Sequence, residues 1–170
     1  MTPILIEVHG LPKGQPRPRA FARQMGSRVV ARVYDAGTAE AWKSQIADAA
    51  RSLVPLEPIA GPLVLDVELW MPRPLGHFVA SKRERGLKPG APRFHESKPD
   101  CDNALKPIAD ALTVIRFWHD DAQVVSMRLV KLYEDPATGP GALIRIERPW
   151  TSEEKPAAPE PMPLFQGAGR

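Results

Sequence analysis

The sequence of 170 residues has a single cysteine, Cys101, and no long apolar run. One cysteine excludes an intrachain disulfide and a zinc site built from cysteines. The absence of a run of about 18 apolar residues excludes a membrane span. The N-terminus has no basic segment ahead of an apolar stretch, so no signal peptide is expected. We therefore expect a protein of a reducing, cytoplasmic compartment with no membrane partner.

Acidic residues are missing from a long N-terminal stretch. Between Val8 and Tyr34 there is no Asp or Glu, and the basic residues there are Lys13, Arg17, Arg19, Arg23, Arg28 and Arg32. A second stretch, 72–99, has seven basic residues against two acidic ones. Both are rich in proline and glycine, which indicates long surface loops. Two basic loops suggest a polyanionic partner such as nucleic acid, and the alternative is that they only aid solubility.

The hydrophobic pattern predicts an α+β domain over residues 1–150, followed by a disordered tail, 151–170, that contains proline and glutamate. Alternating apolar residues predict strands at 3–11, 28–34, 63–71, 123–133 and 142–148, the last two as a hairpin. Apolar residues at helical spacing predict helices at 39–53 and 102–115. These elements predict a mixed or antiparallel sheet with two main helices packed on one face, and with long basic loops.

Four aspartates flank the second predicted helix. Asp100 and Asp102 stand at its start, and Asp120 and Asp121 follow its end. Two carboxylates about 5 Å apart repel by roughly 3 kcal/mol at an effective dielectric of about 20. If the aspartates meet, a divalent cation relieves this repulsion, and oxygen ligands favour Mg²⁺ or Mn²⁺. Lys106, four residues after Asp102, shares its helix face and could offset charge on a phosphate.

The same aspartates also have a purely structural explanation. An aspartate at a helix start is normally a cap, and an Asp-Asp pair in a turn is normal turn chemistry. A helix of about 14 residues spans about 21 Å, so Asp121 can rejoin Asp100 and Asp102 only if the fold brings the start of the next strand alongside. The spacing alone does not decide between these alternatives, nor whether Asp120 or His119 joins a metal site.

The resemblance of the chain to a known family is carried by three segments: Asp100-Cys-Asp102-Asn103-Ala-Leu-Lys106, Asp110-Ala-Leu112 and Trp118-His-Asp120-Asp121-Ala-Gln123-Val124. In order and spacing they resemble the signature of the RusA family of Holliday-junction resolvases, which are phage and prophage endodeoxyribonucleases. Residues 10–19 also resemble the N-terminal loop of phage members. The resemblance covers about residues 3–148.

The resemblance implies a RusA-like fold and a homodimer that resolves four-way DNA junctions by paired, Mg²⁺-dependent nicks in recombination and repair. It implies metal-binding, catalytic carboxylates at Asp100, Asp102 and Asp121, with Asp120 as a further candidate, and a catalytic Lys106. We expect the DNA-binding residues to be Lys13, Arg17, Arg19, Arg23, Lys98 and Lys106.

Two other functions stay open from the sequence. One is a related nuclease that prefers flaps or forks, and the other is a catalytically silent DNA-binding module whose aspartates are caps. In the tail, Leu164-Phe165 resembles the short peptides that dock on bacterial sliding clamps. The sequence does not give the cleavage-site preference or the number of metal ions.

Overall fold

The structure is a computed structural model, and the residues that it describes are 2–15, 19–25, 28–34 and 39–149. For 19–25 and 28–34 the description covers the backbone. The predicted tail with Leu164-Phe165 lies outside the described residues and stays a prediction. Among the residues described, no helix is long and apolar enough to cross a membrane.

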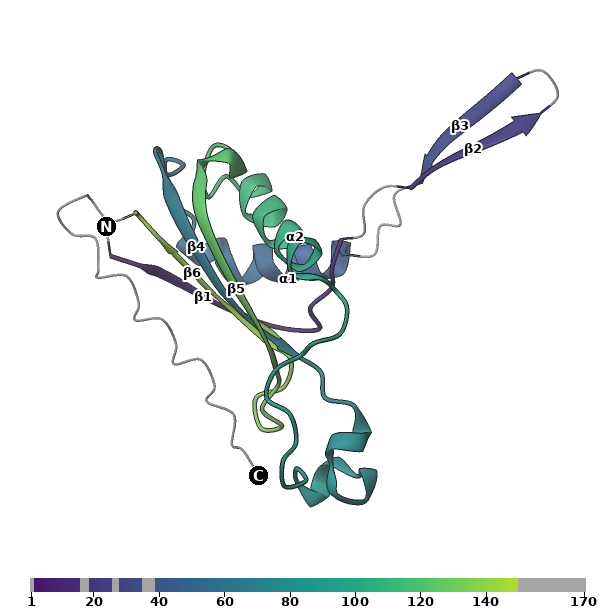
Figure 1. Ribbon diagram of the computed structural model, residues 1–170. Coiled ribbons are helices and arrows are strands. Elements are labelled where there is room, and N and C mark those ends of the chain that lie inside the picture. Colours follow the sequence, from purple (N-terminus) through teal and green to yellow (C-terminus); the bar gives the residue numbers. More distant parts are fainter. Residues whose placement is uncertain (1, 16–18, 26–27, 35–38, 150–170) are drawn as a thin grey trace, which may run out of the picture.

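A four-stranded mixed sheet forms the centre of the molecule, in the order β1-β6-β4-β5 (Figure 1). Its strands are β1 (Ile4–His9), β4 (Leu63–Met71), β5 (Val124–Tyr133) and β6 (Gly141–Glu147). Strand β6 pairs antiparallel with β1 and β4, whereas β4 and β5 run parallel. The predicted mixed sheet is therefore confirmed.

The hairpin expected from the last two strands does not form. Strand β6 inserts between β1 and β4, and β5 pairs with β4 at the edge of the sheet. The reason lies in burial, because Ala142, Ile144 and Ile146 on β6 are fully buried, whereas the first half of β5 is largely exposed. The more apolar strand takes the inner position.

Two helices lie side by side on one face of the sheet (Figure 1). They are α1 (Glu40–Ala50), which continues as the short 3₁₀ helix η1 (Arg51–Leu53), and α2 (Cys101–Val114). The buried residues of α1, Trp42, Ile46 and Ala50, recur every four positions and face the sheet. Both predicted helices and the predicted placement of two helices on one face are confirmed.

The core lies between the helices and the sheet. Alternate residues of β4 from Leu63 to Met71 point toward the helices and are buried, as the period-two pattern predicts. The indoles of Trp42 and Trp118 are each 1% exposed, so both belong to this core. Burial of one large aliphatic side chain, such as those of β4, contributes about 1.5–3 kcal/mol to the stability of the folded state.

Helix α2 is the crossover between the parallel strands β4 and β5, and this sets its direction. A crossover helix runs opposite to the two strands that it connects. The start of α2 therefore lies where β5 ends, and the end of α2 lies where β5 begins. The contacts agree: Lys131, near the end of β5, donates from Nζ to the carbonyls of Ser97 (2.7 Å) and Pro99 (2.8 Å), just before α2.

Two basic segments project from this body. Strands β2 (Arg19–Met25) and β3 (Arg28–Tyr34) form a separate antiparallel ribbon, seen extending away from the sheet in Figure 1. The sequence predicted β3 but a loop in place of β2. The second segment, 72–99, contains three short 3₁₀ helices: η2 (Leu75–His77), η3 (Val79–Ser81) and η4 (Arg83–Arg85).

Candidate active site

Two exposed carboxylates stand at the start of α2. Asp100 is the N-cap residue, in an extended conformation, but its side chain makes no capping hydrogen bond. Asp102 lies in the first turn, and both residues are exposed. The helix macrodipole stabilises negative charge here. The capping explanation therefore does not account for Asp100, whose carboxylate stays available to a ligand.

A proline inside α2 lets the N-terminal segment dock beside these carboxylates. Pro107 has no N–H, so the carbonyl of Asn103, four residues earlier, lacks its helical donor. The backbone N–H of Gln15 donates to that carbonyl at 2.8 Å. Gly14 makes the approach possible, because a Cβ there would lie 2.5 Å from the Cβ of Pro99. No pattern in the sequence predicts this contact, because Gln15 and Asn103 are far apart in the chain.

Lys106 lies one turn after Asp102 and is held by an acidic neighbour. Its Nζ donates to Oδ1 of Asp110 at 3.1 Å, and Nζ of Lys43 on α1 donates to Oδ2 of the same carboxylate at 3.2 Å. Two ammonium groups thus share one carboxylate, and Nζ of Lys43 also pairs with Oε1 of Glu40 at 3.6 Å. Lys106 itself is exposed, so an incoming phosphate can reach it.

The second aspartate pair divides into a cap and a free carboxylate. Asp120 accepts the N–H of Ala122 at 2.8 Å and caps the 3₁₀ helix η5 (Asp121–Gln123). The Gln123 side chain completes the capping box by accepting the N–H of Asp120 at 3.1 Å. The carboxylate of Asp121 is exposed and has no polar partner among the residues described. Asp120 is thus engaged in local structure, and Asp121 is not.

The two aspartate pairs lie at opposite ends of α2. The 14 residues of the helix span about 21 Å, and η5 is held at the far end by Gln123, whose Nε2 donates to the carbonyl of Ile59 at 2.9 Å. In the part of the chain that is described, no three Asp, Glu, His or Cys side chains are placed to hold a metal ion. One chain therefore places Asp100 and Asp102 two residues apart at the start of α2 but does not bring Asp121 to them.

Three of the predicted DNA-binding residues, Lys13, Lys98 and Lys106, lie near the Asp100 end of α2. Lys13 is exposed on the segment that docks on α2, and Lys98 is exposed two residues before Asp100. Arg19 and Arg23 lie on β2, where the description is of the backbone, and Arg17 lies outside the described residues.

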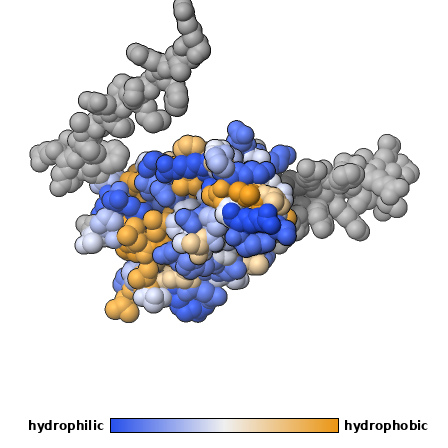
Figure 2. All heavy atoms as spheres, turned by 90° about the horizontal axis from the view of Figure 1, so that it is seen from below, coloured by the Kyte–Doolittle hydropathy of each residue, from blue (hydrophilic) through white to orange (hydrophobic). Residues whose placement is uncertain are grey.

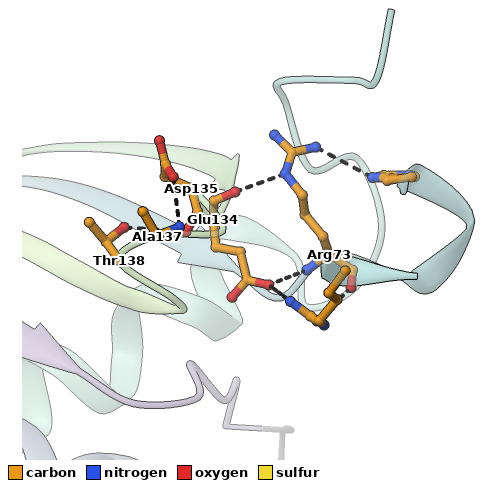
Figure 3. A network of polar contacts seen from close by, with 7 residues as sticks. Arg73, Glu134, Asp135, Ala137 and Thr138 are labelled. Carbon is orange, nitrogen blue, oxygen red and sulfur yellow. Dashed lines mark hydrogen bonds and ion pairs between the residues drawn. The ribbon is translucent and has the colours of Figure 1, made fainter. Parts of the chain in front are cut away.

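The second basic segment is anchored by two of its own arginines, which sequence analysis counted as basic surface. Glu134, 1% exposed, accepts the backbone N–H of Arg73 (3.1 Å) and Nη1 of Arg83 (2.8 Å), and Nε of Arg73 donates to its carbonyl (2.8 Å) (Figure 3). The exposed cations that remain there are Lys82, Arg85, Lys88, Arg93 and Lys98. Seen from below, the surface is mainly hydrophilic, with smaller apolar patches (Figure 2).

Three aromatic rings pack together beside the chain that leads into Asp100. The ring of Tyr133 packs edge-on against His77 and His95, with centroids 4.7 and 5.0 Å away. Burial and the nearby Lys131 ammonium hold the pKa of His95 below its usual 6.5. The same Lys131 anchors Ser97 and Pro99. It therefore positions the start of α2, a role that sequence analysis did not predict.

Exposed carboxylates beside a lysine, approached by two basic segments, form the arrangement expected of a nuclease. The family model described as Endodeoxyribonuclease RusA matches residues 9–147. YqaN of Bacillus subtilis (strain 168) is 32% identical over 132 residues, which cover 78% of this chain and 89% of YqaN. The chain belongs to the RusA endodeoxyribonuclease family.

A second relative matches over a shorter stretch. The crossover junction endodeoxyribonuclease RusA of Escherichia coli (strain K12) is 52% identical over 44 residues, which cover 26% of this chain and 34% of the relative. The family membership confirms the predicted class of enzyme, a nuclease that hydrolyses DNA.

Proposed function

We propose that this nuclease resolves four-way DNA junctions by paired nicks and depends on Mg²⁺, or Mn²⁺ in its place. The observation that carries the proposal is the Asp100–Asp102 pair, held exposed at the start of α2 where both basic segments join the body. The E. coli relative is a crossover junction endodeoxyribonuclease by name, which supports the junction as substrate. The enzyme would act in recombination and repair in the bacterial cytoplasm.

The carboxylates at the start of α2 fit a hard divalent ion. Mg²⁺ is commonly held by one or two carboxylates, with waters and substrate phosphates filling the other positions. Asp100 and Asp102 supply such a pair, and Asp100 is not engaged as a cap. A bound ion would supply an activated water and stabilise charge on the phosphodiester. Lys106, one turn further along and oriented by Asp110, would neutralise the phosphate.

A second subunit would supply the third carboxylate. A two-fold axis that sets two α2 helices side by side and antiparallel places the end of each helix beside the start of the other. Asp121 of the partner subunit would then approach Asp100 and Asp102, and the symmetry would create two such sites. Two symmetric sites suit a junction, whose resolution requires two nicks.

The flank of α2 and β5 offers apolar surface for this pairing. Strand β5 is the outer strand of the sheet. Val114 in the last turn of α2 is 80% exposed, and Val125 and Met127 on β5 are 62% and 50% exposed. Exposed apolar side chains that gather on neighbouring elements mark interaction surfaces. We therefore assign the homodimer interface to this flank.

Cleavage assays with three DNAs test the activity. We expect nicking of a synthetic four-way junction with Mg²⁺, none with EDTA, and at least a hundredfold slower nicking by Asp102→Asn, as for loss of a major transition-state contact. Faster cleavage of a flap or fork than of the junction would favour the related branched-DNA nuclease. Binding without nicking, unchanged in Asp102→Asn, would favour a silent DNA-binding module.

Subunit mixing tests the shared site. Asp102→Asn and Asp121→Asn are each expected to be inactive, but a mixed dimer has one site that carries both changes and one that carries neither. Mixing should therefore restore single nicks. A site built within one chain would carry one change in every subunit, so the mixture would stay inactive. Mixing each variant with itself is the control.

A further inference from the structure

The ribbon formed by β2 and β3 separates its charged and uncharged residues between two faces. In an antiparallel pair, residues directly opposite one another share a face, and successive pairs alternate between faces. The register gives the pairs of one face as Arg19–Tyr34, Phe21–Arg32, Arg23–Val30 and Met25–Arg28. The pairs of the other face are Ala20–Val33, Ala22–Ala31 and Gln24–Val29.

Each pair of the first face contains one arginine, whereas the second face contains no charged residue. The arginines alternate between the two strands, at intervals of about 6.8 Å along the ribbon, and so extend over about 20 Å. The segregation indicates a surface made for a linear anion.

Duplex DNA matches this surface in charge and in width. It carries one negative charge per about 1.7 Å of axis, so about 12 phosphates lie along the length of the ribbon. The major groove, about 12 Å wide, admits a two-stranded ribbon. The N-terminal segment that leads to the ribbon docks on the first turns of α2 through Gln15 and Asn103, so DNA held by the ribbon would continue toward Asp100.

We infer that the face bearing Arg19, Arg23, Arg28 and Arg32 binds the phosphates of one duplex arm of the branched substrate. The inference rests on the proposed function and adds to it a DNA-binding surface outside the metal site, including Arg28 and Arg32. Binding there is independent of sequence, because phosphate contacts position DNA without reading its bases. The same binding is therefore expected for a plain duplex and for an arm of a junction.

The test is the salt dependence of DNA binding, measured by fluorescence anisotropy in EDTA so that no cleavage intervenes. Each phosphate contact contributes about 0.9 to the slope of log affinity against log salt. Arg23→Ala/Arg32→Ala should reduce the slope by about 1.8 for both duplex and junction. Between 50 and 200 mM salt, the wild-type protein should then lose roughly 12-fold more affinity than the variant.

Two controls make the result specific. Arg51→Ala/Arg145→Ala removes the same charge from positions paired with Asp48 and Glu147, and should leave the slope unchanged. Arg23→Lys/Arg32→Lys keeps the charge and should keep the slope. An unchanged slope in the alanine variant, or an equal reduction in the Arg51/Arg145 control, would overturn the inference alone. A wild-type protein that binds no DNA would overturn the proposed function as well.

Discussion

Replacing Gly14 with alanine tests whether close packing of the N-terminal segment positions the carboxylates of α2. The added Cβ would lie 2.5 Å from the Cβ of Pro99 and 3.2 Å from the carbonyl oxygen of Asn103. Carbon atoms in contact normally lie about 3.5–4.0 Å apart, so the overlap with Pro99 is about 1 Å. Either Pro99, next to Asp100, or the Gln15–Asn103 hydrogen bond must give way.

The expected loss of stability follows from these two outcomes, the displacement of Pro99 or the loss of the hydrogen bond. Overpacking of this kind destabilises a protein by about 1–3 kcal/mol, and a lost backbone hydrogen bond costs about 1 kcal/mol. Gly14→Ala should therefore lower the free energy of unfolding by about 1–3 kcal/mol in urea titrations. Because Pro99 directly precedes Asp100, nicking of the junction at saturating DNA should also slow.

Gly76→Ala is the matched control. Among the residues described, no heavy atom beyond the two chain neighbours lies within 4 Å of a Cβ at Gly76, so the same change should be neutral or slightly stabilising. Equal stabilities of the two variants would refute the packing argument. A Gly14 variant that is destabilised but nicks at the wild-type rate at saturating DNA would show that the docking does not position Asp100.

Three further predictions concern the surrounding network. Glu134→Gln removes the buried carboxylate charge that pairs with Nη1 of Arg83 and should lower the free energy of unfolding by about 2 kcal/mol in urea, with faster trypsin cleavage within 72–99. The lowered pKa of His95 means that the unfolded chain binds this proton more readily, so stability present above pH 6.5 should be lost as the pH falls, and less so in His95→Gln. Asp110→Asn should slow nicking by roughly 10- to 100-fold without weakening DNA binding, because Lys106 loses the carboxylate that orients it; weaker binding would contradict this.

Local patterns in the sequence were sufficient for most of the fold. The alternation from Leu63 to Met71 predicts β4 because successive residues of a strand point to opposite faces of the sheet, so every second residue is apolar where one face is buried. The apolar stripe after Asp100 predicts α2 in the same way, and Pro107 does not end that helix. The contact between Gln15 and the Asn103 carbonyl replaces the hydrogen bond that this proline removes.

Long-range pairing could not be predicted from those patterns. Strands β5 and β6 follow one another in the chain, and the short connection between them favours a hairpin. Their places in the sheet depend instead on which strand buries more apolar surface against residues far away in sequence. Strand β2 was missed because its arginines and flanking prolines resemble a loop, and its strand character depends on pairing with β3.

The candidate site shows the same division between local and long-range information. Identical residues have different roles: Asp120 caps η5, whereas Asp100, at a helix start, makes no capping hydrogen bond. The separation of Asp121 from Asp100 follows from topology. A helix that connects two parallel strands runs antiparallel to them, so its two ends lie at opposite ends of the strands. A metal site that used both aspartates would therefore need Asp121 from a second chain, as the proposed dimer supplies.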